Sequence, residues 1–166
     1  MPYGLRTTTA HESSRRPSYH KPLIEPIQKR IAVFEDCPEV LEIVLKALAE
    51  KIPDLEFTHT HFVTSVDQSM NIFMNQRPHI VITDLCLSPG RYDGFEILAR
   101  IRRIEPETRV ALSSSIYSAG AANDPNPNAR RINRKAMKKD FDALFHKADL
   151  EGLSAFVRAH LDEPFH

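Results

Sequence analysis

The chain has 166 residues, 42% of them hydrophobic, which is enough for one domain with a real core and a tail but leaves little room for a second domain. Its 22 basic and 22 acidic residues balance, so charge gives no reason to expect nucleic acid as a partner. No run approaches the roughly 20 apolar residues of a membrane span, and the amino terminus has no apolar signal core, so no membrane contact is expected. The two cysteines, Cys37 and Cys86, are too few for a disulfide framework and favour a reducing, cytoplasmic location.

Residues 1–29 differ in composition from the rest of the chain. They contain four prolines, several serines and threonines, and basic residues, but few large apolar residues. Such a segment buries too little apolar surface to offset the conformational entropy lost on ordering. We therefore predict a disordered N-terminal extension over residues 1–29 and a folded domain over residues 30–166.

From Ile31 onward, short apolar runs alternate with amphipathic helical patterns. A buried strand is predicted over 31–34, followed by a helix that begins near Pro38, because the first turn of a helix tolerates a missing backbone donor. Alternating polar and apolar residues predict an edge strand over 55–62, and a helical pattern follows over 65–75.

The second half of the chain repeats this alternation. Strands are predicted over 79–83, 109–113 and 143–146, and helices over 95–104, 129–139 and 150–161. The polar stretch between the fourth strand and the fourth helix, which runs through Asn128, is predicted to be a loop. Five strands alternating with five helices predict an α/β protein with a doubly wound parallel sheet and helices on both of its faces.

Polar and charged side chains follow four of the predicted strands. Glu35 and Asp36 come after the first strand, Asp84 after the third, Ser114 after the fourth and Lys147 after the fifth. The carboxyl ends of parallel strands share one edge of the sheet, where such folds place their ligand crevice. Three carboxylates, a hydroxyl and an ammonium group at one edge suit a divalent cation and a phosphoryl group.

These residues, together with Asp93-Gly94 at the start of the third helix, give the segment from about Arg30 to Asp162 a clear family likeness. The segment resembles the receiver domain of bacterial two-component response regulators. The resemblance implies a flavodoxin-like, five-stranded sheet with strand order 2-1-3-4-5. It also implies a single-domain response regulator that signals by protein contact within a phosphorelay.

The resemblance assigns a role to each acidic residue. Asp84 is the expected phosphoacceptor, and its carboxylate attacks a phosphohistidine on a sensor histidine kinase or a histidine phosphotransfer protein. In this way the domain catalyses its own modification. Glu35, Asp36 and Asp84 are expected to hold Mg²⁺ together with the backbone carbonyl of Cys86.

The resemblance also assigns the remaining polar groups. Lys147 is expected to pair first with Asp84 and then with a phosphoryl oxygen, while the Ser114 hydroxyl bonds another oxygen. Counting from Gly94 favours Ser114 for this role, with Ser113 as the next candidate. The added charge is expected to shift the face of the fourth helix and fifth strand, which a downstream protein then reads.

Two residues depart from the family pattern. Ala148 stands after the lysine where the family usually has proline, and Leu144 stands where it often has an aromatic residue that swings with the hydroxyl. They support an alternative reading as a degenerate receiver that acts as a phosphorylation-independent adaptor. A phosphohydrolase is a more distant alternative, because such enzymes typically need a second acid where this chain has Cys86. The basic stripe over 130–139 is interpreted as a solvated helix face.

Overall fold

The structure is a computed structural model that describes residues 30–53, 55, 59–116 and 126–161. The extension predicted over 1–29 lies outside the described residues. So do residues 56–58 of the predicted second strand and residues 117–125 of the predicted loop. None of the described helices is long and apolar enough to cross a membrane.

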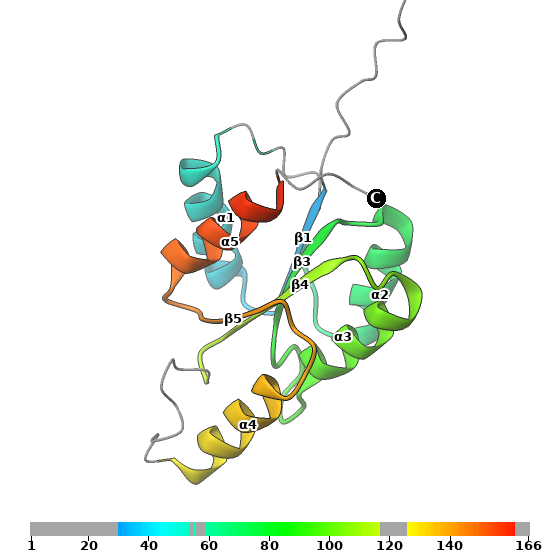
Figure 1. The fold of residues 1–166 in the computed structure, drawn as a ribbon, viewed down its shortest axis with the longest axis vertical. Coiled ribbons are helices and arrows are strands. Elements are labelled where there is room, and N and C mark those ends of the chain that lie inside the picture. The colour runs from blue at the N-terminus through cyan, green and yellow to red at the C-terminus, as the bar shows by residue number, and fades with distance from the viewer. Residues whose placement is uncertain (1–29, 54, 56–58, 117–125, 162–166) are drawn as a thin grey trace, which may run out of the picture.

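Five parallel strands form one sheet in the order β2-β1-β3-β4-β5 (Figure 1). The strands are β1 (Ile31–Glu35), β2 (His59–Phe62), β3 (Ile80–Asp84), β4 (Arg109–Ser114) and β5 (Ala143–His146). The helices are α1 (Pro38–Lys51), α2 (Val66–Gln76), α3 (Asp93–Ile104), α4 (Pro127–Met137) and α5 (Leu150–Leu161). The α/β class, the parallel sheet and its strand order agree with the prediction.

Helices cover both faces of the sheet, as predicted (Figure 1). Successive side chains of a strand point to opposite faces, and β1 follows this rule. Its residues Ile31 and Val33 pack in the layer formed with α1 and α5, whereas Ala32 and Phe34 pack in the layer formed with α2 and α3. Because both faces are covered, β1 and β3 are buried along their whole length.

The start of α4 corrects the sequence prediction. The loop was expected to run through Asn128 and the helix to span 129–139, but α4 begins at Pro127 and ends at Met137. The side-chain oxygen of Asn126 accepts a hydrogen bond from the Asn128 backbone N–H at 2.9 Å and so caps the helix. Proline fits the next position because its missing N–H has no partner within the helix. The asparagine-proline pattern therefore marks a helix start here.

Other element boundaries also differ from the prediction, and β1, β3 and β4 each end one residue later than predicted. β2 is described over His59–Phe62, and Leu55, where the strand was predicted to begin, has no strand structure. α2 begins at Val66, because the Ser65 hydroxyl accepts a hydrogen bond from the Gln68 backbone N–H at 3.2 Å and caps it. α3 begins at Asp93, two residues before the predicted start at Phe95.

Asp142 joins the start of β5 to α3 and β4. Its carboxylate accepts a hydrogen bond from the Val110 backbone N–H at 2.7 Å and pairs with Arg102 at 2.7 Å and Arg109 at 3.2 Å. Burial alone would raise the pKa of Asp142. The Val110 N–H and the two guanidinium groups outweigh burial and lower the pKa below its ordinary value.

We predict that Asp142→Asn lowers the free energy of unfolding at neutral pH by about 2 kcal/mol, because the neutral amide loses the charge-assisted bonds. The folded-state pKa of Asp142 is depressed, so the stability that it contributes is present above the ordinary carboxyl pKa and is lost as the pH falls through the folded-state value. Urea unfolding of both proteins from neutral pH to below about pH 4 should therefore show the difference shrinking on acidification.

Asp140→Asn is the matched control, because Asp140 also pairs with Arg102, at 3.3 Å, but has a side chain that is 91% exposed. The control should change stability little at any pH. A loss from Asp142→Asn that is independent of pH would contradict this account.

Candidate functional site

The carboxylates of Glu35, Asp36 and Asp84 meet at the carboxyl edge of the sheet. Glu35 is the last residue of β1 and Asp84 is the last residue of β3, and these two strands are neighbours. One carboxylate oxygen from each of the three residues lies within 4.8 Å of the others. The three acids that the sequence singled out are therefore brought together, as expected for a sheet whose strands all run in one direction.

Lys147 reaches this acidic group from the other side. It follows β5, and its Nζ lies 2.8 Å from Glu35 Oε1 and 3.0 Å from Asp84 Oδ2. The lysine side chain is 17% exposed, and the two carboxylates are 5% and 8% exposed. Ala148, which follows the lysine in place of the family's proline, does not prevent this reach.

Burial and mutual repulsion set the protonation of the site. Burial raises the pKa of Glu35 and, with Asp36 nearby, the pKa of Asp84, and Lys147 offsets only part of each rise. Burial would lower the pKa of Lys147, but the hydrogen bond that its ammonium group donates to Glu35 and the charge of Asp84 outweigh burial and raise the pKa. Three acids facing one ammonium group leave the site with excess negative charge, which favours an added cation.

Backbone groups at the end of β3 hold Asp84 in place. The Leu85 N–H donates to Asp84 Oδ1 at 2.6 Å, and the Thr83 hydroxyl donates to the Asp84 carbonyl at 3.0 Å. The N–H of Gly94 in turn donates to the Leu85 carbonyl at 3.0 Å. A Cβ at Gly94 would lie only 2.6 Å from the Asp84 carbonyl oxygen, so a residue without a side chain is required at the start of α3.

The Leu85 N–H was not foreseen from the sequence. Every residue except proline carries a backbone N–H, so the identity of Leu85 gives no signal of its role. The sequence indicates Gly94 only through the family resemblance, and the physical reason for this glycine is the close approach of α3 to the end of β3.

Comparisons with known proteins identify the fold. No protein-family model matches the chain, and no curated protein matches it. Among solved structures, the BeF₃-activated receiver domain of DrrB from Thermotoga maritima matches with a TM-score of 0.57 and 23% identity, over 82% of this chain and 100% of that one. The signal receiver domain of NarL from Mycobacterium tuberculosis matches with a TM-score of 0.60 and 21% identity, over 83% and 100%. A CheY-like receiver domain protein from Methanospirillum hungatei JF-1 matches with a TM-score of 0.58 and 17% identity, over 81% and 94%.

The chain has the receiver-domain fold. The matches cover more than four fifths of this chain and nearly the whole length of the solved receiver domains. The likeness is one of fold.

Ser113 and Ser114, the two candidates for the hydroxyl that bonds a phosphoryl oxygen, are the last two residues of β4. The strand register places Ser113 opposite Asp84 and Ser114 opposite His146. Both serines are buried, at 5% and 2% exposure. The Ser114 hydroxyl accepts a hydrogen bond from the Ile116 N–H at 3.2 Å, while its carbonyl accepts one from the Lys147 N–H at 3.3 Å. Ser114 therefore adjoins Lys147, and the choice between the two hydroxyls stays a prediction.

The thiol of Cys86, two residues after Asp84, is protonated near neutral pH. Burial, and then the charges of Asp84 and Asp93, raise its pKa to about 11. A protonated thiol is a poor ligand for any metal. The thiol is therefore not expected to bind a metal, and the role of the Cys86 backbone carbonyl stays a prediction.

The three carboxylates fit the ion that the receiver fold implies. Mg²⁺ prefers hard oxygen ligands and keeps several of its waters, so a few carboxylates and one carbonyl suffice to hold it. Glu35, Asp36 and Asp84 offer such oxygens, and Asp36 is the most exposed of the three. The donor set suits Mg²⁺ better than a soft metal.

We predict that Gly94→Ala lowers the free energy of unfolding by about 2–4 kcal/mol, because the new methyl group forces α3 away from the end of β3. Urea unfolding at neutral pH measures the change. Gly152→Ala in α5 is the matched control, because the new methyl group would meet only the side chain of Asp149. The control should lose much less stability, since Asp149 can move and alanine is the better helix former. Equal losses in the two variants would contradict this account.

Proposed function

We propose that this protein is a single-domain response regulator whose Asp84 accepts a phosphoryl group in a two-component phosphorelay. The observation that carries the proposal is the pair of salt bridges that Lys147 forms with Glu35 and Asp84, with the Asp36 carboxylate beside them. The domain extends over residues 30–166 and acts on a downstream protein by direct contact. Its phosphoryl donor is a sensor histidine kinase or a histidine phosphotransfer protein.

In the proposed reaction, a carboxylate oxygen of Asp84 attacks the phosphorus atom of a phosphohistidine. A new P–O bond forms, the P–N bond breaks, and the leaving imidazole takes up a proton. The carboxylate is already oriented, because the Leu85 N–H holds Asp84 Oδ1 at 2.6 Å. The product is an acyl phosphate on Asp84.

The site supplies charge for this transfer. Glu35, Asp36 and Asp84, with the Cys86 carbonyl, are the groups that would hold Mg²⁺, which when bound neutralises charge on the phosphoryl oxygens. Lys147 pairs with Asp84 before the reaction and would pair with a phosphoryl oxygen afterwards. Ser114, one residue beyond the position opposite Asp84, is the proposed hydroxyl partner.

The change of partner at Lys147, from the Asp84 carboxylate to a phosphoryl oxygen, would also act as a conformational switch. A phosphoryl group adds nearly two negative charges and three acceptor oxygens at Asp84. Lys147 and Ser114 would follow it, and the Lys147 N–H is bonded to the Ser114 carbonyl, so the ends of β4 and β5 would move together. Leu144 of β5 packs against the cluster that includes residues of α4, so a shift of β5 is transmitted to α4 by packing.

We expect one phosphoryl group to be added when the protein is incubated with acetyl phosphate and Mg²⁺, as measured by intact mass. The gain should be lost in Asp84→Asn and in a sample whose metal has been removed by a chelator. Asp36→Asn should reduce the gain, because it removes one ligand charge and leaves the nucleophile in place. A gain that persists in Asp84→Asn would contradict the assignment.

A matched pair of variants tests the hydroxyl assignment. Ser114→Ala should slow the phosphoryl gain more than Ser113→Ala if Ser114 bonds the phosphoryl oxygen, and the reverse order would transfer the role to Ser113. The degenerate adaptor is the second candidate function, favoured by Leu144 at the position of the family's aromatic residue. It becomes the better account if Mg²⁺ binds, as measured by calorimetry, but no phosphoryl group is gained.

A further inference from the structure

α4 and the two residues that follow it carry five exposed basic side chains on one face. Arg131, Arg134, Lys135 and Lys138 follow one another at helical spacing, and Lys139 lies one turn beyond Lys135. We call these five residues the basic face. Its opposite side holds the helix to the sheet through buried Ala129, Ile132 and Ala136.

The basic face has no acidic counterpart within the part of the chain that the structure describes. Residues 126–139 contain no aspartate or glutamate. The next two acids, Asp140 and Asp142, are engaged by Arg102 on α3, at 3.3 Å and 2.7 Å. No described carboxylate lies within ion-pair distance of any of the five basic side chains.

This arrangement is unfavourable for the isolated domain. Like charges three and four residues apart on a helix repel one another and destabilise it by a few tenths of a kcal/mol per pair. The whole chain has zero net charge, so the basic face is a local concentration and not part of a generally basic surface. A partner with negative charge would relieve the repulsion.

The side chains of the basic face line two shallow hollows in the protein surface. The five side chains line a hollow of about 520 Å³. A second hollow, of about 140 Å³, is lined by Tyr92, Ile132 and two residues of the first hollow, Arg131 and Lys135. The two hollows are therefore neighbours that share Arg131 and Lys135, and their linings extend from the end of α4 to the loop before α3.

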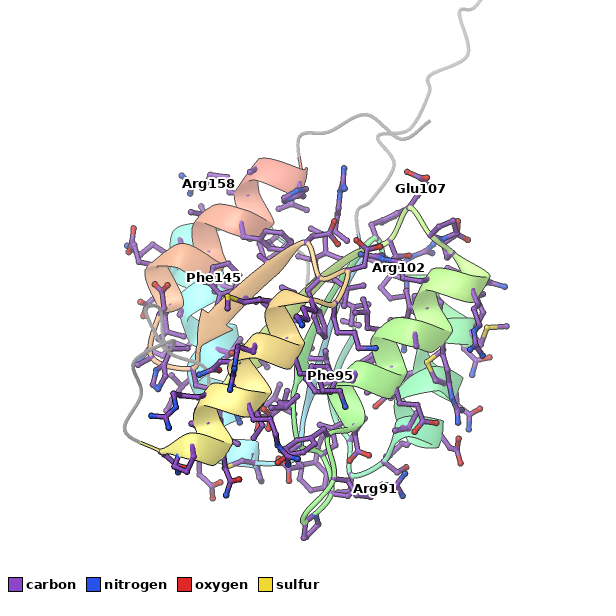
Figure 2. All side chains as sticks on the ribbon, turned by 60° about the horizontal axis from the view of Figure 1, so that its bottom comes forward. Arg91, Phe95, Arg102, Glu107, Phe145 and Arg158 are labelled. Carbon is purple, nitrogen blue, oxygen red and sulfur yellow. The ribbon has the colours of Figure 1, made fainter. Side chains whose placement is uncertain are left out.

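An aromatic pair lies at the end of this surface near α3. The ring centroids of Tyr92 and Phe95 are 6.2 Å apart, and Lys135 Nζ lies 4.9 Å from the centroid of the Phe95 ring. Figure 2 shows Phe95 between α3 and α4. Tyr92 is 36% exposed, so it can contact a partner. Exposed tyrosine and arginine side chains on one surface are typical of protein interfaces.

We propose that the basic face of α4, together with Tyr92, is a docking surface for an acidic segment of a partner protein. Arginine pairs with carboxylates through two parallel hydrogen bonds, and the hollows offer apolar contact beside the charges. This inference rests on the proposed function in one respect, that the protein acts by contact with another protein. It adds the chemistry by which that partner is recognised.

The observations favour a protein over nucleic acid as the occupant. A nucleic-acid-binding domain typically has a strongly basic pI, whereas the pI of this chain is about 7.1. The basic face spans only the nine residues 131–139, about 13 Å at the rise of a helix, so it would contact few phosphates. Short acidic segments of proteins match that length.

A binding assay with defined probes tests the docking surface. The probe is a short fluorescein-labelled peptide of alternating glutamate and tyrosine, and the competing probe is a DNA duplex with the same label. Fluorescence anisotropy is measured with the full chain at about 0.1 M salt, where longer-range charge effects are largely screened. Arg131→Glu with Lys135→Glu should weaken peptide binding at least about tenfold.

Two further double variants serve as controls. Lys46→Glu with Arg103→Glu changes the net charge by the same amount but lies on α1 and α3, and it should alter peptide binding less than about twofold. Arg131→Gln with Lys135→Gln removes the charges without reversing them and should give an intermediate loss. Circular dichroism shows that each variant is folded.

Three results of the binding assay would contradict the proposed docking surface. Equal losses in the two Glu double variants, or no binding of the peptide at all, would overturn the docking surface. Tighter binding of the duplex than of the peptide, lost in Arg131→Glu with Lys135→Glu, would make nucleic acid the occupant and also overturn it. The assay needs no phosphoryl group, so a failure of Asp84 to accept phosphate is recognised separately by intact mass.

Discussion

The ammonium group of Lys147, shared between the carboxylates of Glu35 and Asp84, is the interaction on which the rest of the structure depends. It joins the ends of β1, β3 and β5, which are far apart in the sequence, at one point. Burying three charged groups is costly unless they are paired, so this contact determines how the strand ends converge. With Asp36 beside them, the acids outnumber the cation. The excess of carboxylates therefore suits a divalent cation, which the proposed phosphoryl transfer requires.

A continuous series of contacts leads from this centre to the surface of α4. Asp84 is held by the Leu85 N–H, and the Leu85 carbonyl accepts from the Gly94 N–H at the start of α3. Phe95, the next residue, packs with Ile132 of α4 and lies under the ammonium group of Lys135. A change at Asp84 can therefore reach the basic face through packed groups, although the docking of an acidic partner does not require it.

Much of the fold could be predicted from the sequence, because buried strands and amphipathic helices leave clear periodic patterns. The boundaries 143–146 and 150–161 agree with β5 and α5. The start of α4 was missed, since a run of asparagines and prolines is equally typical of a loop and only the cap made by Asn126 distinguishes the two. Within the site, the order of residues along the chain predicted the meeting of Glu35, Asp36 and Asp84. It could not predict that Lys147 bridges two carboxylates, because that depends on the geometry of the end of β5.

The most direct test of the account uses NMR spectra of backbone amides, recorded before and after Mg²⁺ and beryllofluoride, a phosphoryl mimic, are added. The account predicts that the amide signals of Leu85, Ser114 and Lys147 shift strongly, and that these shifts are absent in Asp84→Asn. Smaller shifts should extend to α4, because Leu144 and Phe95 pack against it. Unchanged spectra, or the same shifts in Asp84→Asn, would contradict the claim that Asp84, Lys147 and the neighbouring acids form a phosphoryl-accepting centre.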